Sequence, residues 1–361
     1  MIDFIPLEHY GRVYYTILAA FIGSFAIMLS RYPRAVVAHP GVKNNVVLLW
    51  GWACVVILVL LLGLRPISFS FGDMGNYYKQ FRVYEYGGEL GTSDVLFEAM
   101  MWAFARYMNA GSFFFACIVL YLLPLAVAFR RLLGQYWPLA FFLAAAHFDF
   151  YGYGVNGIRQ GVASSLMLLA LTSKGVRSWL LVGAAIGFHG SLVVPAIAYA
   201  MTLVFRKPRY YFYGWGICLL ATSVYSGFGD LIFSSSFSDD RLDRYVDMDS
   251  GLLEQFSKVG FRFDFLAYGL LPILLGYYVV IVRGIRDESY VRLLQVYLTA
   301  NAVWLLMIRT PISNRVAYLS WFLMGILIAY PLVRYKIFKD QHLVYVAILL
   351  VMFSYTLVRN I

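Results

Sequence analysis

Two ionisable side chains stand where an otherwise apolar stretch of the sequence begins or breaks. Arg159 opens the run IRQGVASSLMLLAL, and His189 interrupts another run between Gly187 and Gly190. A guanidinium beside the N–H groups of a helix start forms a cradle for phosphate or carboxylate. An imidazole is suited to act as a general base near neutral pH. The structural alternative for His189 is a buried histidine that has found a hydrogen-bond partner.

Arg159 also has structural alternatives, which the sequence alone leaves open. Its guanidinium would then reach lipid headgroups or pair with Asp149 across a short turn. Small residues recur every four positions at Gly157, Gly161 and Ser165, a spacing typical of close helix packing. Such packing predicts a helix buried inside the protein, with Arg159 facing an internal cavity.

Two further segments carry candidate side chains. In FGDMGNYYKQF, Asp73 is a candidate base or ligand of a sugar hydroxyl, and Tyr77 is a candidate platform for a pyranose ring. In RTPISNRVAYLSW, Arg309 and Arg315 bracket a short turn and are candidates to clamp a diphosphate. The alternatives are a turn-initiating aspartate, an interfacial tyrosine and arginines that contact lipid headgroups.

The composition indicates which elements must position these residues. Of the 361 residues, 61% are hydrophobic and 13% are charged, with a mean hydropathy of +0.72. Soluble domains contain roughly 45–50% apolar and about 25% charged residues. Several apolar runs also approach the roughly 20 residues that cross a bilayer. We therefore expect an all-α polytopic membrane protein with about 11–12 transmembrane helices, forming one integral membrane domain over residues 1–361.

The net charge of +10 is distributed as a topology signal, and we infer no nucleic-acid partner from it. The basic residues gather in short clusters between apolar runs, a pattern typical of cytoplasmic loops. These clusters are Arg31/Arg34/Lys43, Arg130/Arg131, Lys174/Arg177, Arg206/Lys207/Arg209, Arg283/Arg286/Arg292 and Arg334/Lys336/Lys339. Residues 178–205 are too long for one ordinary crossing, so we expect two short helices that turn back at His189. Both termini then lie outside.

Two long external loops follow from this topology, over residues 65–111 and 228–262. Within the first loop, residues 94–107 have apolar side chains at helical spacing, which predicts a helix lying along the membrane surface. The sequence has no HExxH pair, no GxSG nucleophile motif, and no P-loop or dinucleotide fingerprint. These absences argue against a metalloprotease and an intramembrane serine protease, and nothing in the sequence suggests a cofactor.

Four motifs occur in an order that resembles a known family. FGDMGNYYKQF resembles G-D-x-x-x-Y, and NGIRQGVASSLMLLAL resembles N-x-[IV]-R-Q-x-[IL]-A at a helix start. GFHGSLVVP resembles an F-H-x-S-A helix break, with Gly190 in place of a bulkier residue, and NRVAYLSWF resembles R-x-x-x-Y. Together, over roughly residues 71–322, they resemble the EpsG family of Wzy-type bacterial polysaccharide polymerases.

The resemblance implies a GT-C-like glycosyltransferase of the bacterial inner membrane, with an active site that faces the periplasm. Its substrates would be oligosaccharide repeat units on undecaprenyl diphosphate within the membrane lipid. The growing glycan would leave its lipid diphosphate for a hydroxyl of the incoming unit, with no metal. The family also implies a co-polymerase partner that regulates chain length.

The matching positions receive roles under this resemblance. His189 is the first candidate for the base that accepts the hydroxyl proton, and Asp73 is the second. The residues expected to bind diphosphate or glycan are Arg159, Arg315, Gln160, Asn156, Tyr77, Arg309 and Tyr318.

Three other functions remain open from the sequence. One is an O-antigen ligase-like transferase, which moves glycan to a different acceptor. Another is a non-enzymatic transporter or flippase of lipid-linked oligosaccharide, a class that usually shows repeated halves, whereas no internal repeat is visible here. The third is a membrane O-acyltransferase for sugars. The sequence does not indicate which sugar is used, which linkage is made, or whether the anomeric configuration is inverted.

Overall fold

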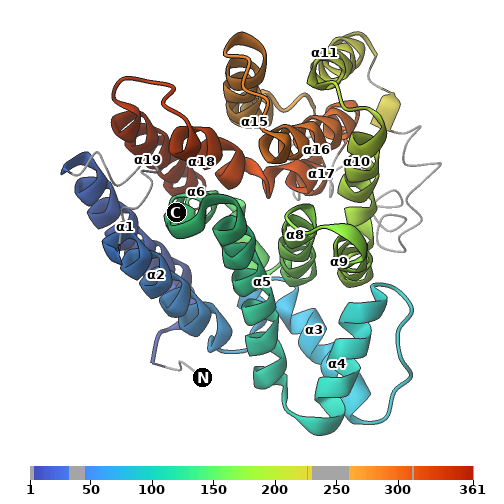
Figure 1. Ribbon diagram of the computed structural model, residues 1–361. Helices are drawn as coiled ribbons and strands as arrows, with labels where there is room; N and C mark the ends of the chain where they lie inside the picture. Colours follow the sequence, from blue (N-terminus) through green and yellow to red (C-terminus); the bar gives the residue numbers. More distant parts are fainter. Residues whose placement is uncertain (1–3, 32–44, 226, 230–259, 311–312, 361) are drawn as a thin grey trace. The chain divides into compact units, whose positions relative to one another are not determined.

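The structure is a computed structural model that describes residues 4–31, 45–225, 227–229, 260–310 and 313–360 (Figure 1). Within these ranges it contains helices and no strand. The α-helices are α1 (Tyr10–Arg31), α2 (Asn45–Gly63), α3 (Met74–Glu85), α4 (Val95–Tyr107), α5 (Ala110–Leu133), α6 (Trp137–Ala145), α7 (Asp149–Val155), α8 (Ile158–Leu171), α9 (Gly175–Phe188), α10 (Val193–Val204), α11 (Pro208–Val224), α15 (Phe263–Tyr277), α16 (Glu288–Leu306), α17 (Ser313–Trp321), α18 (Met324–Arg334) and α19 (Gln341–Asn360).

The predicted all-helical, multi-pass membrane protein is confirmed. Six helical stretches among the described residues are long and apolar enough to cross a membrane, namely Leu7–Arg31, Asn45–Gly63, Ala110–Ala145, Phe263–Val282, Ser313–Arg334 and Gln341–Asn360. Three shorter helical stretches are also apolar, Ile158–Leu171, Gly175–Phe188 and Gly190–Val204. The larger number of crossings, the GT-C-like arrangement and the orientation of the termini stay predictions.

The chain divides into two compact units. Unit 1 comprises Met1–Val193 and Met324–Ile361, and unit 2 comprises Val194–Leu323. In unit 2, α16 packs against α11 and α17, and Trp215 of α11 donates a hydrogen bond to Asn301 of α16 at 2.8 Å. The single integral membrane domain expected from the sequence stays a prediction.

Helix α8 is the centre of unit 1. Every one of its residues is buried, from Ile158 to Leu171, and α8 packs against α5 and α9 (Figure 1). A Cβ atom on Gly161 would lie 2.8 Å from the carbonyl oxygen of Tyr153, so a side chain there would collide with the backbone of α7. The predicted burial of this helix and the need for a small residue at Gly161 are confirmed.

The first predicted external loop contains two helices, α3 and α4. The helix expected over residues 94–107 is present as α4, and its position along a membrane surface stays a prediction. Tyr84 of α3 donates a hydrogen bond to Glu98 of α4 at 2.5 Å, and the same hydroxyl accepts one from the Gly91 N–H at 2.9 Å. These bonds tie α3, α4 and their connection into one layer beside α8 and α9.

The predicted helix break at His189 is also present. Helix α9 ends at Phe188, His189 has extended backbone with φ −159° and ψ 113°, and a short 3-10 turn at Gly190–Leu192 precedes α10. The boundary between the two units falls at Val193 and Val194, so the return of the chain at this break stays a prediction. Most of the second expected loop, residues 230–259, lies outside the described residues.

Candidate functional site

A buried carboxylate, Asp94, joins the two ionisable residues that the sequence singles out. Its Oδ2 atom accepts a hydrogen bond from Nη1 of Arg159 in an ion pair, and it lies 3.4 Å from Nδ1 of His189. Its other oxygen, Oδ1, accepts a hydrogen bond from the Gly190 N–H at 3.0 Å. The exposed fractions are 12% for Asp94, 9% for Arg159 and 24% for His189. We call these three residues the Asp94 cluster.

The guanidinium of Arg159 is held on several sides. Its Nε donates to the hydroxyl of Tyr77 at 3.2 Å, and its carbon lies 5.4 Å and 5.8 Å from the ring centres of Tyr77 and Phe97. Aromatic faces attract such a cation. Among the described hydrogen bonds of Arg159, none uses Nη2, which therefore keeps two N–H donors for an anion.

Close packing between α4 and α9 brings the cluster together. A Cβ atom on Gly187 would lie 2.7 Å from Cγ of Leu96, so only a glycine lets the two helices approach this closely. Leu96 follows Asp94 by two residues, and Gly187 precedes His189 by two. The Asp94 carboxylate makes no cap bond to its own helix and instead reaches His189 and Gly190.

The surroundings of Asp94 favour its charged form. Burial alone would raise the pKa of this carboxyl group, but the hydrogen bond with His189 and the charge of Arg159 outweigh it, so the pKa lies below its usual value. The carboxylate therefore stays ionised at neutral pH and can orient the imidazole. Nδ1 of His189 faces Asp94, and Nε2 makes none of the described hydrogen bonds.

Asp73 and Asn156 form a second contact in unit 1. The Asp73 N–H donates to Oδ1 of Asn156 at 2.8 Å, while the Asp73 carboxylate accepts from Asn76 at 3.3 Å. Gly72 has a φ of +65°, and a Cβ atom there would lie 2.4 Å from Oδ1 of Asn156. This close approach fixes the start of α3 against the turn before α8.

The other predicted residues fall in different places. Gln160 is buried in α8 at 9% exposure. Arg309, Arg315 and Tyr318 belong to unit 2, where the guanidinium of Arg309 lies 5.3 Å from the ring centre of Phe261 and Arg315 is exposed. The alternative pairing of Arg159 with Asp149 is wrong, since the ion pair of Arg159 is with Asp94. Asp149 lies 3.5 Å from His147.

Sequence reasoning identified Asp94 only as the start of a helix. An aspartate before an apolar helical run is typical of an N-cap, so its type and place gave no sign of tertiary contacts with Arg159 and His189. The one available signal was a carboxylate in the same external loop as Asp73. Within the described part of the chain, no group of three or more His, Cys, Asp or Glu side chains is placed to hold a metal ion.

In a comparison with protein families, one family model matches most of the chain. The model of the EpsG family matches residues 48–361, a stretch that includes every member of the Asp94 cluster. The chain belongs to the EpsG family. EpsG proteins are Wzy-type polysaccharide polymerase-like membrane proteins, and membership indicates a glycosyltransferase-like polymerase. No curated protein and no solved structure matches the chain.

Proposed function

We propose that this protein polymerises oligosaccharide units carried on undecaprenyl diphosphate at the periplasmic face of the bacterial inner membrane. The observation that carries the proposal is one carboxylate, Asp94, joined to both Arg159 and His189 in an EpsG protein. The bond between the anomeric carbon of the growing glycan and its lipid diphosphate breaks. A new bond forms from that carbon to a hydroxyl of the incoming unit, whose proton passes to the protein.

Arg159 is assigned to the departing lipid diphosphate. Negative charge develops on that group as its bond to the glycan breaks, and preorganised donors in a dry site stabilise such charge. Nη2 supplies the donors, while Asp94 and Tyr77 hold the guanidinium in place. Asn156 and Gln160, from the turn before α8 and its first residues, are assigned supporting roles at the diphosphate.

His189 is assigned as the general base. With Nδ1 donating its hydrogen to Asp94, the lone pair lies on Nε2, which then accepts the proton of the acceptor hydroxyl. Asp94 is a positioning residue for this imidazole. Asp73 is the second candidate base. Arg315, Arg309 and Tyr318 of unit 2 are assigned to diphosphate or glycan binding, and a chain-length co-polymerase is the proposed protein partner.

The test uses the purified full-length protein in lipid nanodiscs with defined repeat units on undecaprenyl diphosphate. We expect a ladder of longer glycans that remain on undecaprenyl diphosphate and that also form in excess EDTA. Arg159→Ala and His189→Gln should each lower the rate by about 10²-fold or more. Arg177→Ala and His9→Gln are matched controls at exposed positions and should keep the wild-type rate.

Each alternative function predicts a different product. Glycan on the core of lipid A in place of a ladder indicates a ligase-like transferase. Movement of intact lipid-linked units across the bilayer without any new glycosidic bond indicates a flippase. A ladder formed at the wild-type rate by both Arg159→Ala and His189→Gln contradicts the assigned chemistry.

A further inference from the structure

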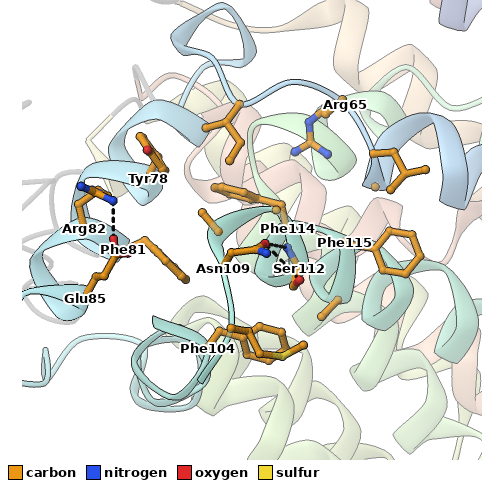
Figure 2. Close-up of a pocket in the computed structure, with 17 residues that line it drawn as sticks. Arg65, Tyr78, Phe81, Arg82, Glu85, Phe104, Asn109, Ser112, Phe114 and Phe115 are labelled. Carbon is orange, nitrogen blue, oxygen red and sulfur yellow. Dashed lines mark hydrogen bonds and ion pairs between the residues drawn. The ribbon is translucent and has the colours of Figure 1, made fainter. Parts of the chain in front are cut away.

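A pocket of about 800 Å³ lies in unit 1, with walls from α3, the end of α4 and the first turns of α5 (Figure 2). Pockets for small molecules commonly measure about 300–1,000 Å³, so this one has the size of a ligand site. Much of its lining is apolar and aromatic, from Phe81, Phe104, Phe114, Phe115 and Ala116. The roles assigned in glycosyl transfer use none of the residues that line it.

Two helices that can cross a membrane have their ends at this pocket. Helix α2 ends at Gly63 and α5 begins at Ala110, and both residues line the pocket. Residues 64–109, which join them, contain no stretch long and apolar enough to cross a membrane, so the two ends lie on the same side. A Cβ atom on Gly63 would lie 2.7 Å from Cδ2 of Phe115, so α2 and α5 are in direct contact here. The pocket therefore lies where the hydrocarbon region meets the membrane surface.

The charged residues of the pocket stand opposite its apolar wall. Arg82 and Glu85 of α3 form an ion pair at 2.6 Å, and their side chains are 42% and 40% exposed. In Figure 2 this pair lies at one side of the pocket and Phe115 lies at the other. A pocket with an apolar wall at the membrane-spanning helices and a charged, exposed rim matches the shape of an amphiphile.

The polar groups of the lining are largely satisfied by one another. Arg82 donates hydrogen bonds to Glu85 and to the hydroxyl of Tyr86. The side-chain oxygen of Asn109 accepts from the N–H and the hydroxyl of Ser112, at 2.9 Å and 3.2 Å. Ligand sites orient a polar ligand through precisely placed polar groups, and here those groups already bond within the protein. The lining therefore favours an apolar chain over a sugar.

The charges at the rim are balanced. Glu85 neutralises Arg82. Arg65 also lines the pocket, but its Nε and Nη2 atoms are buried and its Nη1 donates to the carbonyl of Leu62. A diphosphate would meet a neutral pair at this rim. A zwitterionic headgroup offers one opposite charge to each member of the pair and is the better match.

We propose that this pocket binds one acyl chain of a zwitterionic bilayer phospholipid, with the chain against the phenylalanines and the headgroup at Arg82 and Glu85. The lipid is a resident component of the fold and is not a substrate. It contacts Tyr78 of α3, the neighbour of Tyr77, whose hydroxyl accepts a hydrogen bond from Arg159. The inference goes beyond the proposed function and does not depend on it.

The test uses the purified full-length protein and a phosphatidylethanolamine probe with a diazirine in one acyl chain. Irradiation should label peptides of α3 and of the first turns of α5. Ala116→Trp, which fills the pocket, should reduce this labelling by about tenfold or more. Val127→Trp is the matched control, because Val127 lies on α5 outside the pocket at 40% exposure, and it should label like the wild type. Labelling that Ala116→Trp leaves unchanged overturns the proposal.

Competition identifies the class of lipid. Unlabelled phosphatidylethanolamine should displace the probe, whereas phosphatidylglycerol and polyprenyl diphosphate at the same ratio should displace it less. Equal displacement by phosphatidylglycerol overturns the zwitterionic headgroup. Stronger displacement by polyprenyl diphosphate than by phosphatidylethanolamine overturns the phospholipid as the occupant.

Glu85→Gln tests the rim without filling the pocket. The Glu85 side chain is 40% exposed, so this variant should fold even if Ala116→Trp fails to do so in gel filtration. Removing the negative charge should shift the preference from phosphatidylethanolamine toward phosphatidylglycerol by about twofold to fivefold, the effect of one exposed ion pair. An unchanged preference overturns the placement of the headgroup at this pair.

The same preparation separates this inference from the proposed function. A wild-type protein that makes the glycan ladder but carries the label outside the pocket overturns the lipid site and leaves the polymerase intact. A wild-type protein that is labelled in the pocket but forms no glycosidic bond supports the lipid site and overturns the polymerase.

Discussion

Replacing Asp94 by asparagine removes one charge from the centre of the candidate site while keeping the shape of the side chain. The asparagine amide oxygen can still accept the Gly190 N–H, so that bond weakens without being lost. The ion pair with Arg159 disappears, which leaves a guanidinium at 9% exposure with one hydroxyl and two aromatic rings. Removing one partner of a buried pair costs about 3–5 kcal/mol. Because some exposure and the two rings remain, we expect the lower end, about 3 kcal/mol.

Thermal and denaturant unfolding of the purified protein in detergent measure this cost. Glu8→Gln is the control, since the Glu8 side chain is 78% exposed and its loss should have little effect. A double-mutant cycle with Arg159→Gln isolates the pair. The double variant carries no uncompensated charge, so it should be less destabilised than the sum of the two single variants. An Asp94→Asn cost no larger than that of Glu8→Gln, or strict additivity in the cycle, refutes the ion pair.

Three further predictions use the same preparations. The pKa of Asp94 lies below its usual value in the folded protein, so its stabilising contribution is complete above about pH 4 and is lost as pH falls through the lower folded pKa. The melting difference between wild type and Asp94→Asn should therefore narrow only below that pH, and a constant difference would contradict it. Gly72→Ala should lower the free energy of unfolding by more than about 1–2 kcal/mol, because it adds a collision with Asn156 to a strained φ. Gly183→Ala is the control, since Gly183 has no neighbour within 4 Å. Equal melting temperatures of the two variants would refute the prediction. Gly161→Val should lower the melting temperature more than Gly183→Val does, through its collision with α7, and a smaller loss would show that α7 moves aside.

Local pattern predicted the elements of the site well. The apolar run from Ile158 to Leu171 is bounded by Gly157 and Thr172, so its length and its small residues predicted both the helix and its burial. The break at His189 followed from the length of the stretch around it and from two adjacent glycines. Each of these signals lies within a few residues of the element it predicts.

The partners of the candidate residues could not be predicted in the same way. Asp94 lies 65 residues from Arg159 and 95 from His189 along the chain. Its contacts depend on how closely α4 packs against α9, which is set by a glycine and a leucine that look ordinary in sequence. Asp149, ten residues before Arg159 in the sequence, was the predicted alternative partner, but the ion pair of Arg159 is with Asp94.

The shared carboxylate also determines how the net charge of the Asp94 cluster changes during the proposed reaction. With His189 neutral, the charges of Asp94 and Arg159 cancel. When His189 accepts the proton of the acceptor hydroxyl, the cluster gains one positive charge as the diphosphate leaves with its negative charge. Interactions that strengthen in this way act on the transition state more than on bound substrate. Asp94→Asn gives the cluster a net positive charge before any proton is transferred, and it removes the carboxylate that orients the imidazole of His189. The kcat should therefore fall by about 10²-fold or more, while KM stays level or falls.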